Sequence, residues 1–170
     1  MKRIHGRREG TVHTLFEELR AVIDGDVIVL GVGNTMRADD GAGCLVAARL
    51  AETYPERAFD VGQTPENYVG PIRRAEAGTL IVVDAADFDG APGEIRLVTP
   101  DDIGGLMIGT HAAPLGLFMR ALSEDTRCRA ELVAIQAANT TLDGELTAEV
   151  ALAIGAVTDV LLQILGLRGG

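Results

Sequence analysis

The chain alternates short runs of β-branched and aliphatic residues with longer segments in which apolar residues recur every three or four positions. This alternation is typical of an α/β domain, in which helices connect the strands of a parallel sheet. The apolar runs predict strands at residues 26–33, 58–62, 79–85, 93–99 and 131–137, and the helical spacing predicts helices at residues 11–23, 43–53, 65–75, 112–122 and 147–165.

Three of these strands, at residues 26–33, 79–85 and 131–137, are almost continuously apolar, as central parallel strands covered on both faces should be. We therefore predict a single three-layer α/β domain with a mostly parallel, twisted sheet of about five strands, helices on both faces and an additional N-terminal helix. The predicted division is an N-terminal extension at residues 1–25, which carries the additional helix, and an α/β domain at residues 26–170.

Composition and charge narrow the function classes. A length of 170 residues is usual for one compact domain. The formal net charge of −10 disfavours binding to nucleic acid or to an anionic membrane surface. The strand-like apolar runs are shorter than the roughly 18 residues of a membrane span, and the basic start lacks the features of a secretion signal, so we expect a cytoplasmic, monomeric protein without a transmembrane helix. Cys44 and Cys128 have no metal-binding spacing and are expected to be buried apolar residues.

A glycine-rich segment, GVGNTMRADDGAG at residues 31–43, follows the first predicted strand. Strand, glycines and helix favour a dinucleotide-binding loop, but the fingerprint requires a small residue where Met36 stands, and Asp60 is offset from the position of the usual acid. Two carboxylates, Asp39 and Asp40, would also repel a phosphate at the start of the following helix. Nucleotide binding is therefore the least favoured alternative.

The Asp39-Asp40 pair has a simple structural interpretation as an N-cap and a first-turn acid of the helix that begins near Gly41. One aspartate is sufficient for that role. The second would have no structural task and would suffer like-charge repulsion, so we expect a cation as the partner of this segment.

Two further residues lie where they could share such a cation. Asp84 ends a predicted buried strand, and ligands of open α/β sheets bind beyond the carboxyl ends of the strands, although an acid there can also cap a turn. His111 opens a predicted helix and is the only histidine outside the N-terminal segment. A histidine at the start of a helix is often only a polar surface residue. Together with Asp40 they would provide two oxygen ligands and one nitrogen ligand, which suits nickel, zinc, iron or manganese and leaves positions open for a substrate.

With these segments in order, the sequence resembles the hydrogenase maturation endopeptidases, and more closely the branch that serves hydrogenases of the formate-hydrogenlyase type. The matching segments are GVGN at 31–34, DDG at 39–41, DVG at 60–62, LIVVDA at 80–85, PGEI at 92–95 and TH at 110–111. The family usually has two glycines before a Ser or Thr in the second-strand turn, whereas this chain has DVGQT at 60–64, which puts the role of that turn in substrate positioning in question.

The resemblance implies a nickel-dependent protease that removes the C-terminal extension of a [NiFe]-hydrogenase large-subunit precursor. Its three nickel ligands, which are also its catalytic residues, correspond to Asp40, Asp84 and His111. The precursor is its partner and brings the nickel. A non-catalytic nickel carrier or assembly chaperone on the same fold stays open as an alternative, because ligands alone do not show turnover.

Overall fold

The computed structural model describes residues 11–106 and 112–167, and all structural statements below concern this part of the chain. Its strands are β1 (Val27–Val32), β2 (Ala58–Gly62), β3 (Thr79–Ala86), β4 (Ile95–Val98) and β5 (Arg129–Gln136). Its α-helices are α1 (Thr11–Val22), α2 (Ala42–Ala51), α3 (Val69–Ala75), α4 (Ile103–Leu106), α5 (Ala112–Thr126) and α6 (Ala148–Leu167), and two short 3-10 helices, η1 (Ala38–Gly41) and η2 (Pro65–Tyr68), precede α2 and α3.

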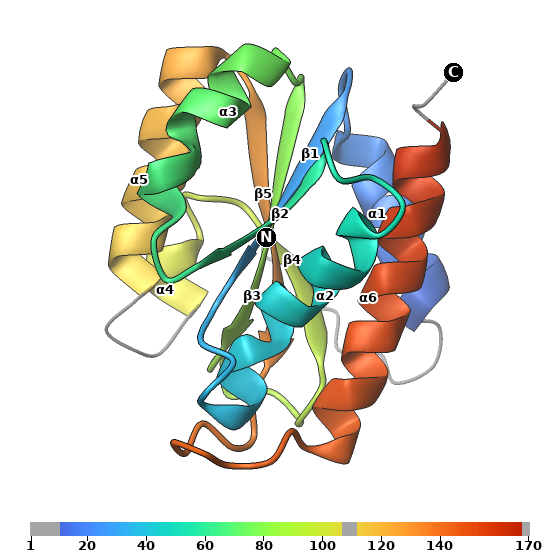
Figure 1. Cartoon of the computed structure of the whole chain (residues 1–170), viewed down its shortest axis with the longest axis vertical. Helices are drawn as coiled ribbons and strands as arrows, with labels where there is room; N and C mark the ends of the chain where they lie inside the picture. The colour runs from blue at the N-terminus through green and yellow to red at the C-terminus, as the bar shows by residue number, and fades with distance from the viewer. Residues whose placement is uncertain (1–10, 107–111, 168–170) are drawn as a thin grey trace.

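The five strands form one sheet in the order β2-β1-β3-β5-β4 (Figure 1). Strands β2, β1, β3 and β5 are parallel, and β4 pairs antiparallel with β5 at the edge. The chain leaves β1 toward β2 on one side and later returns to β3 on the other side, so the order of the sheet reverses at β1. Open α/β sheets bind their ligands at the carboxyl ends of the strands at such a point.

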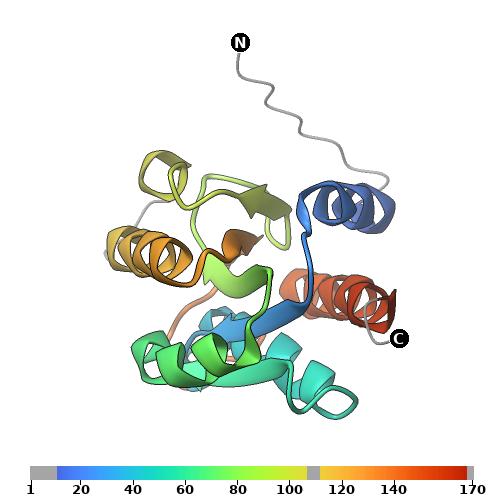
Figure 2. The same ribbon diagram turned by 90° about the horizontal axis from the view of Figure 1, so that it is seen from above.

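Apolar side chains fill both faces of the sheet. One cluster joins α1, α2 and α6 to the sheet through residues such as Leu19, Leu50 and Leu161. The other joins α3, α4 and α5 to the opposite face through residues such as Ile72, Ile103 and Met119. Figure 2 shows α1 and α6 on one side of the sheet and α3 and α5 on the other. The predicted three-layer α/β fold with an additional N-terminal helix is thus confirmed, while the division of the chain at residue 26 stays a prediction.

Helix α6 is a long apolar segment whose burial in the core accounts for its composition. By length and composition alone its 20 residues could cross a membrane. In this fold half of the helix is buried, and Ile154, Val157 and Leu161 pack in the cluster with α1 and α2. This burial is that of a core helix in an α/β domain.

A candidate metal centre at the carboxyl ends of the strands

The glycines after β1 allow backbone to pack on backbone. A Cβ atom on Gly43 would collide with the carbonyl oxygens of Val83 and Val32, and one on Gly31 would collide with the carbonyl of Gly43. The first turn of α2 therefore lies directly on β1 and β3. Gly33 has a φ of +147°, and a Cβ atom there would collide with the carbonyl oxygen of Asp40, so this position requires glycine.

Asp40 lies in η1, in the short connection from β1 to α2, and is half-buried. Its backbone N–H donates to the Arg37 carbonyl at 3.0 Å, and its carbonyl accepts from the Asn34 N–H at 3.1 Å. Ala38, two residues earlier, has a φ of +48°, a left-handed conformation that is uncommon for alanine. The turn that carries Asp40 is therefore defined by several backbone bonds and contains one strained residue.

Asp39 has a structural role that the sequence analysis did not foresee. Its carboxylate is fully buried and accepts hydrogen bonds from the backbone N–H groups of Ala138, Asn139 and Thr147 and from the Thr147 hydroxyl. Burial alone would raise the pKa of Asp39, but these bonds outweigh it and lower the pKa below its ordinary value. The argument that a helix cap is the only structural task for this pair was wrong, because Asp39 binds backbone groups about a hundred residues further along the chain.

The helix-cap interpretation of the pair also differs from the structure. The N-cap position of α2 is Gly41, and no side chain makes a capping hydrogen bond there. Asp39 instead binds the connection between β5 and α6. Asp40 is therefore the acid of this pair that stays a candidate ligand.

Asp84 lies near the end of β3, where it pairs with Ala134 of β5, and only 9% of its surface is exposed. Burial raises the pKa of Asp84 well above its ordinary value, the negative charge of Asp40 raises it further, and a hydrogen bond with the backbone of Ala85 lowers it in part. The two predicted carboxylate ligands, although 44 positions apart in the sequence, are therefore close enough to repel each other. Such a pair is stabilised when a cation binds between its members.

Asp60 is a third carboxylate at this edge of the sheet, near the end of β2. It acts on the buried thiol of Cys44, whose pKa is raised to about 12 by burial, by a hydrogen bond with the Asp60 carboxylate and by the charges of Asp60 and Asp84. Sequence reasoning considered Asp60 only as an acid of a nucleotide site and missed it here. Its place at the end of a strand beside β1 was the available signal.

Cys44 and Cys128 are both buried, as expected, with the pKa of Cys128 raised to about 11, mainly by burial. Asp87, after β3, accepts from the Asp89 N–H and from the Gln136 side chain, so it stabilises a turn. His111 lies outside the described residues. In the described part of the chain no three His, Cys, Asp or Glu side chains are grouped so as to hold a metal ion.

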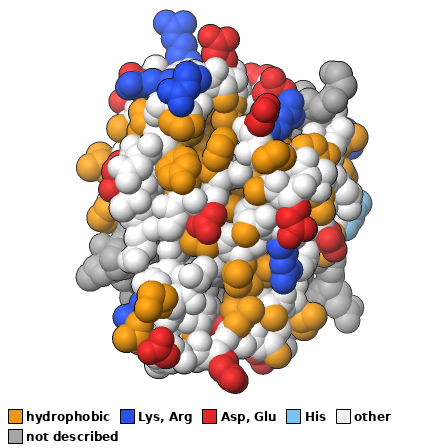
Figure 3. Space-filling view, in the orientation of Figure 1, with side chains coloured by type: hydrophobic (Ala, Val, Ile, Leu, Met, Phe, Trp, Pro, Cys, Tyr) orange, Lys and Arg blue, Asp and Glu red, His pale blue; other side chains and the backbone are white. Residues whose placement is uncertain are grey.

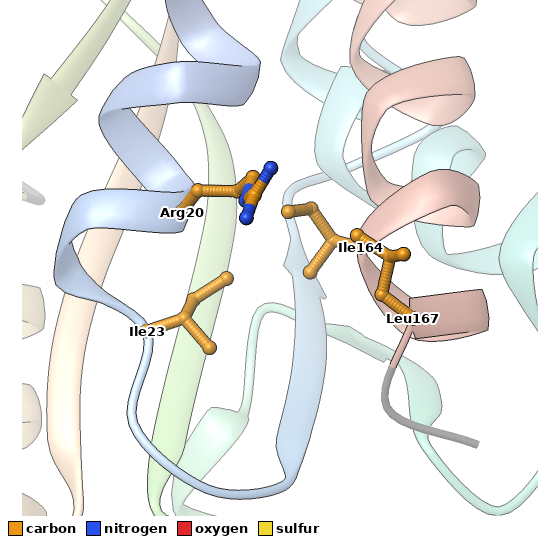
Figure 4. A pocket seen from close by; sticks show the side chains of 4 residues that line it. All are labelled: Arg20, Ile23, Ile164 and Leu167. Atoms are coloured by element: carbon orange, nitrogen blue, oxygen red, sulfur yellow. The ribbon is translucent and has the colours of Figure 1, made fainter. Parts of the chain in front are cut away.

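A cavity of about 290 Å³ lies elsewhere, between the ends of α1 and α6, and is lined by Arg20, Ile23, Ile164 and Leu167 (Figure 4). Ile23 precedes β1 in the chain, whereas Asp40 follows it, so this cavity is at the opposite edge of the sheet from the carboxylates. It contains no group with evident chemistry for hydrolysis or metal binding, and we place the candidate site at the carboxyl edge.

An open α/β sheet with two repelling carboxylates at the point where its strand order reverses has the features of a cation-binding site in an enzyme-like domain. Residues 44–164, more than half of the chain, match the hydrogenase maturation protease family known as HycI, and the chain belongs to that family. It is 42% identical over 101 residues to a hydrogenase 3 maturation protease of Escherichia coli, an alignment that covers 58% of this chain and 65% of that protein.

Solved structures agree with this assignment. A crystal structure of a [NiFe] hydrogenase maturation protease HycI from Thermococcus kodakarensis is similar with a TM-score of 0.79 and 28% identity, over 90% of this chain and 99% of that chain. A solution structure of the endopeptidase HycI from Escherichia coli is similar with a TM-score of 0.70 and 29% identity, over 85% of this chain and 92% of that chain. The chain thus matches about two thirds of the length of its curated E. coli relative and nearly all of the T. kodakarensis structure.

Proposed function

We propose that this protein is an endopeptidase that removes the C-terminal extension from a [NiFe]-hydrogenase large-subunit precursor after nickel has been inserted into it. The observation that carries the proposal is the repelling pair of Asp40 and Asp84 at the reversal point of the sheet, in a chain that belongs to the hydrogenase maturation protease family. Relatives named as endopeptidases and maturation proteases support the hydrolytic activity.

In this proposal Asp40, Asp84 and His111 bind the nickel ion that arrives with the precursor, which is thus part of the substrate. Two carboxylate oxygens and an imidazole nitrogen suit a borderline divalent ion and leave coordination positions for the precursor's own ligands. When bound, the ion would serve as a Lewis acid near the scissile bond or as a tether for the precursor. Burial and the charge of Asp40 both oppose ionisation of Asp84, and a cation bound between the two carboxylates would favour the charged form.

The same ligand set explains why the site should discriminate between loaded and unloaded precursor. Without a thiolate or a fourth ligand from this chain, free nickel should bind weakly, and affinity should increase when the precursor contributes its ligands. Cleavage would therefore follow nickel insertion.

The charge of the protein disfavours a polyanionic substrate. Acidic side chains are spread over the face seen in Figure 3, while basic side chains gather chiefly at one end, and the net charge is −10. An acidic protein repels nucleic acid and anionic membrane surfaces. Because α6 is half-buried within the fold, we propose a cytoplasmic location, while the monomeric state stays a prediction.

The test is incubation of the purified protein with nickel-loaded precursor, followed by mass spectrometry of the precursor. We expect a mass loss equal to the C-terminal extension with the wild-type protein and at least about 10²-fold slower loss with Asp40→Asn. Asp26→Asn is the matched control, because Asp26 is an exposed acid at the amino end of β1 and pairs only at the surface, with Arg57. A stable complex with unshortened precursor would instead indicate the carrier or chaperone function.

A further inference from the structure

Two segments far apart in the sequence are joined beside the candidate site. One is the turn at residues 33–41 between β1 and α2, and the other is the connection at residues 137–147 between β5 and α6, which lie at the same end of the molecule (Figure 1). Besides the side-chain bonds of Asp39, the Asp39 N–H donates to the Asn139 carbonyl at 2.9 Å, and the Asp143 N–H donates to the Met36 carbonyl at 2.8 Å.

Asp39 is the centre of this junction. Its Oδ2 accepts from the N–H groups of Ala138 and Asn139, both at 2.9 Å, and its Oδ1 accepts from the Thr147 N–H at 2.8 Å. The Thr147 hydroxyl is shared between the two oxygens at 3.1 and 3.0 Å. Hydrogen bonds to a charged acceptor are about twice as strong as neutral ones, so this carboxylate fixes both segments at once.

The turn needs such an external anchor. Ala38 adopts a left-handed conformation, which is unfavourable for alanine and persists only when the surroundings impose it. Asp39 and Asp40 follow directly, and the backbone bonds of Asp40 to Asn34 and Arg37 belong to the same turn. Release of the anchor would allow Ala38 to relax, and this change of backbone angle would displace Asp39 and Asp40, which follow it in the same turn.

We propose that Asp39 is a positioning residue: its bonds to residues 138–147 hold the strained turn that directs Asp40 toward Asp84. The Asp39 carboxylate is fully buried, and both of its oxygens already accept hydrogen bonds, so it acts through the turn. The effect on processing rests on the proposed function, whereas the effect on the turn does not.

The test uses variants that perturb the anchor from the side of Thr147, so that Asp39 keeps its charge. Thr147→Val removes the hydroxyl donor, and Thr147→Ser retains it. Thr79→Val is the matched control, because the Thr79 hydroxyl is also buried and also joins distant segments, through two 2.8 Å bonds with Asp24, but at the amino end of β3. Asp39→Asn is the stronger variant, because its amide N–H group must face backbone donors.

The first readout is hydrogen exchange of the Asn34 and Asp40 amides, which bond within the turn and not to Asp39. We expect faster exchange at both in Thr147→Val, rescue in Thr147→Ser and wild-type exchange in Thr79→Val. Unchanged exchange of these amides in Thr147→Val would overturn the proposal.

The second readout is the rate of precursor processing, where we expect a severalfold loss for Thr147→Val and about 10²-fold for Asp39→Asn if it folds. The proposal would also be overturned if Thr147→Val and Thr79→Val had equal melting temperatures and lost the same fraction of processing activity. Failure of the wild-type protein to process any precursor, with faster turn exchange in Thr147→Val, would reject the proposed function but leave the anchor intact.

Discussion

Two buried carboxylates on neighbouring strands are treated in opposite ways by this fold. Glu131, near the start of β5, is almost fully buried and receives a hydrogen-bonded ion pair from Arg129, with Arg129 Nε 2.8 Å from Glu131 Oε1. Asp84, near the end of β3, has another carboxylate as its charged neighbour. In the described residues no Lys or Arg forms an ion pair with Asp84 or Asp40.

The difference shows which end of the sheet is built for stability and which for binding. Burying a charge is costly unless it is paired, and at the amino end the chain supplies the partner itself. At the carboxyl end no Lys or Arg of the described residues forms an ion pair with Asp84, which favours a bound cation as the counter-charge. Buried and unpaired acids of this kind are typical of functional sites, where stability is given up for binding.

The largest expected effect is that of Asp84→Asn, which should abolish processing and yet stabilise the metal-free protein. Because the pKa of Asp84 is raised in the folded state, its contribution to stability is complete below about pH 4 and is lost as the pH rises. Asparagine cannot ionise and so avoids this loss. We expect the free energy of unfolding to increase by about 1–3 kcal/mol at pH 7 and to be unchanged near pH 3. Chemical denaturation in the presence of a chelator measures it, and a destabilised variant at pH 7 would contradict the comparison.

Glu131→Gln should lower the free energy of unfolding, in contrast to Asp84→Asn. Removal of the carboxylate leaves the Arg129 guanidinium without its partner, and we expect a loss of about 1–2 kcal/mol, limited because Arg129 is half exposed. Processing should persist at temperatures where the variant is folded. Denaturation curves of this variant and of Asp84→Asn, recorded together at pH 7, test the contrast directly, and a shift in the same direction for both would refute it.

A smaller effect should distinguish the two thiols. Cys44 lies at the acidic end with a pKa of about 12, and Cys128 lies at the other end with a pKa of about 11. Both pKa values exceed the unfolded value of about 9, so the stability from each thiol is complete below that pH and is lost as the pH rises toward 11 to 12. Asp60→Asn should lower the pKa of Cys44 and speed its alkylation at pH 9, while Cys128 is unchanged. Equal acceleration at both cysteines would indicate general loosening instead.

Much of the fold followed from local patterns. The central strands β1, β3 and β5 are encoded as continuous apolar runs, and their positions were predicted within a few residues. The antiparallel direction of β4 was not predicted, because four residues of half-buried strand carry no signal of orientation.

The site was harder to predict, since the roles of its residues depend on contacts between segments that are distant in the sequence. Asp40 could be selected as one of two adjacent acids before a helix and Asp84 as an acid at a strand end, and the charge of Asp40 acts on Asp84 in the structure. Asp39 was misjudged because Thr147, its partner, is 108 positions away. The roles of Asp40, Asp84 and His111 as metal ligands stay predictions, and His111 lies outside the described residues.

The long separation between Asp39 and its partners also sets when the site can form during synthesis. Residues 33–41 leave the ribosome roughly a hundred residues before 138–147, which corresponds to about 5–20 s of translation. Asp84 is synthesised within this interval, and from then on the nascent chain has both carboxylates but not the segment that fixes the turn of Asp40. Assembly of the centre is therefore a late event of folding, and an incomplete chain should be unable to compete for the metal of its substrate.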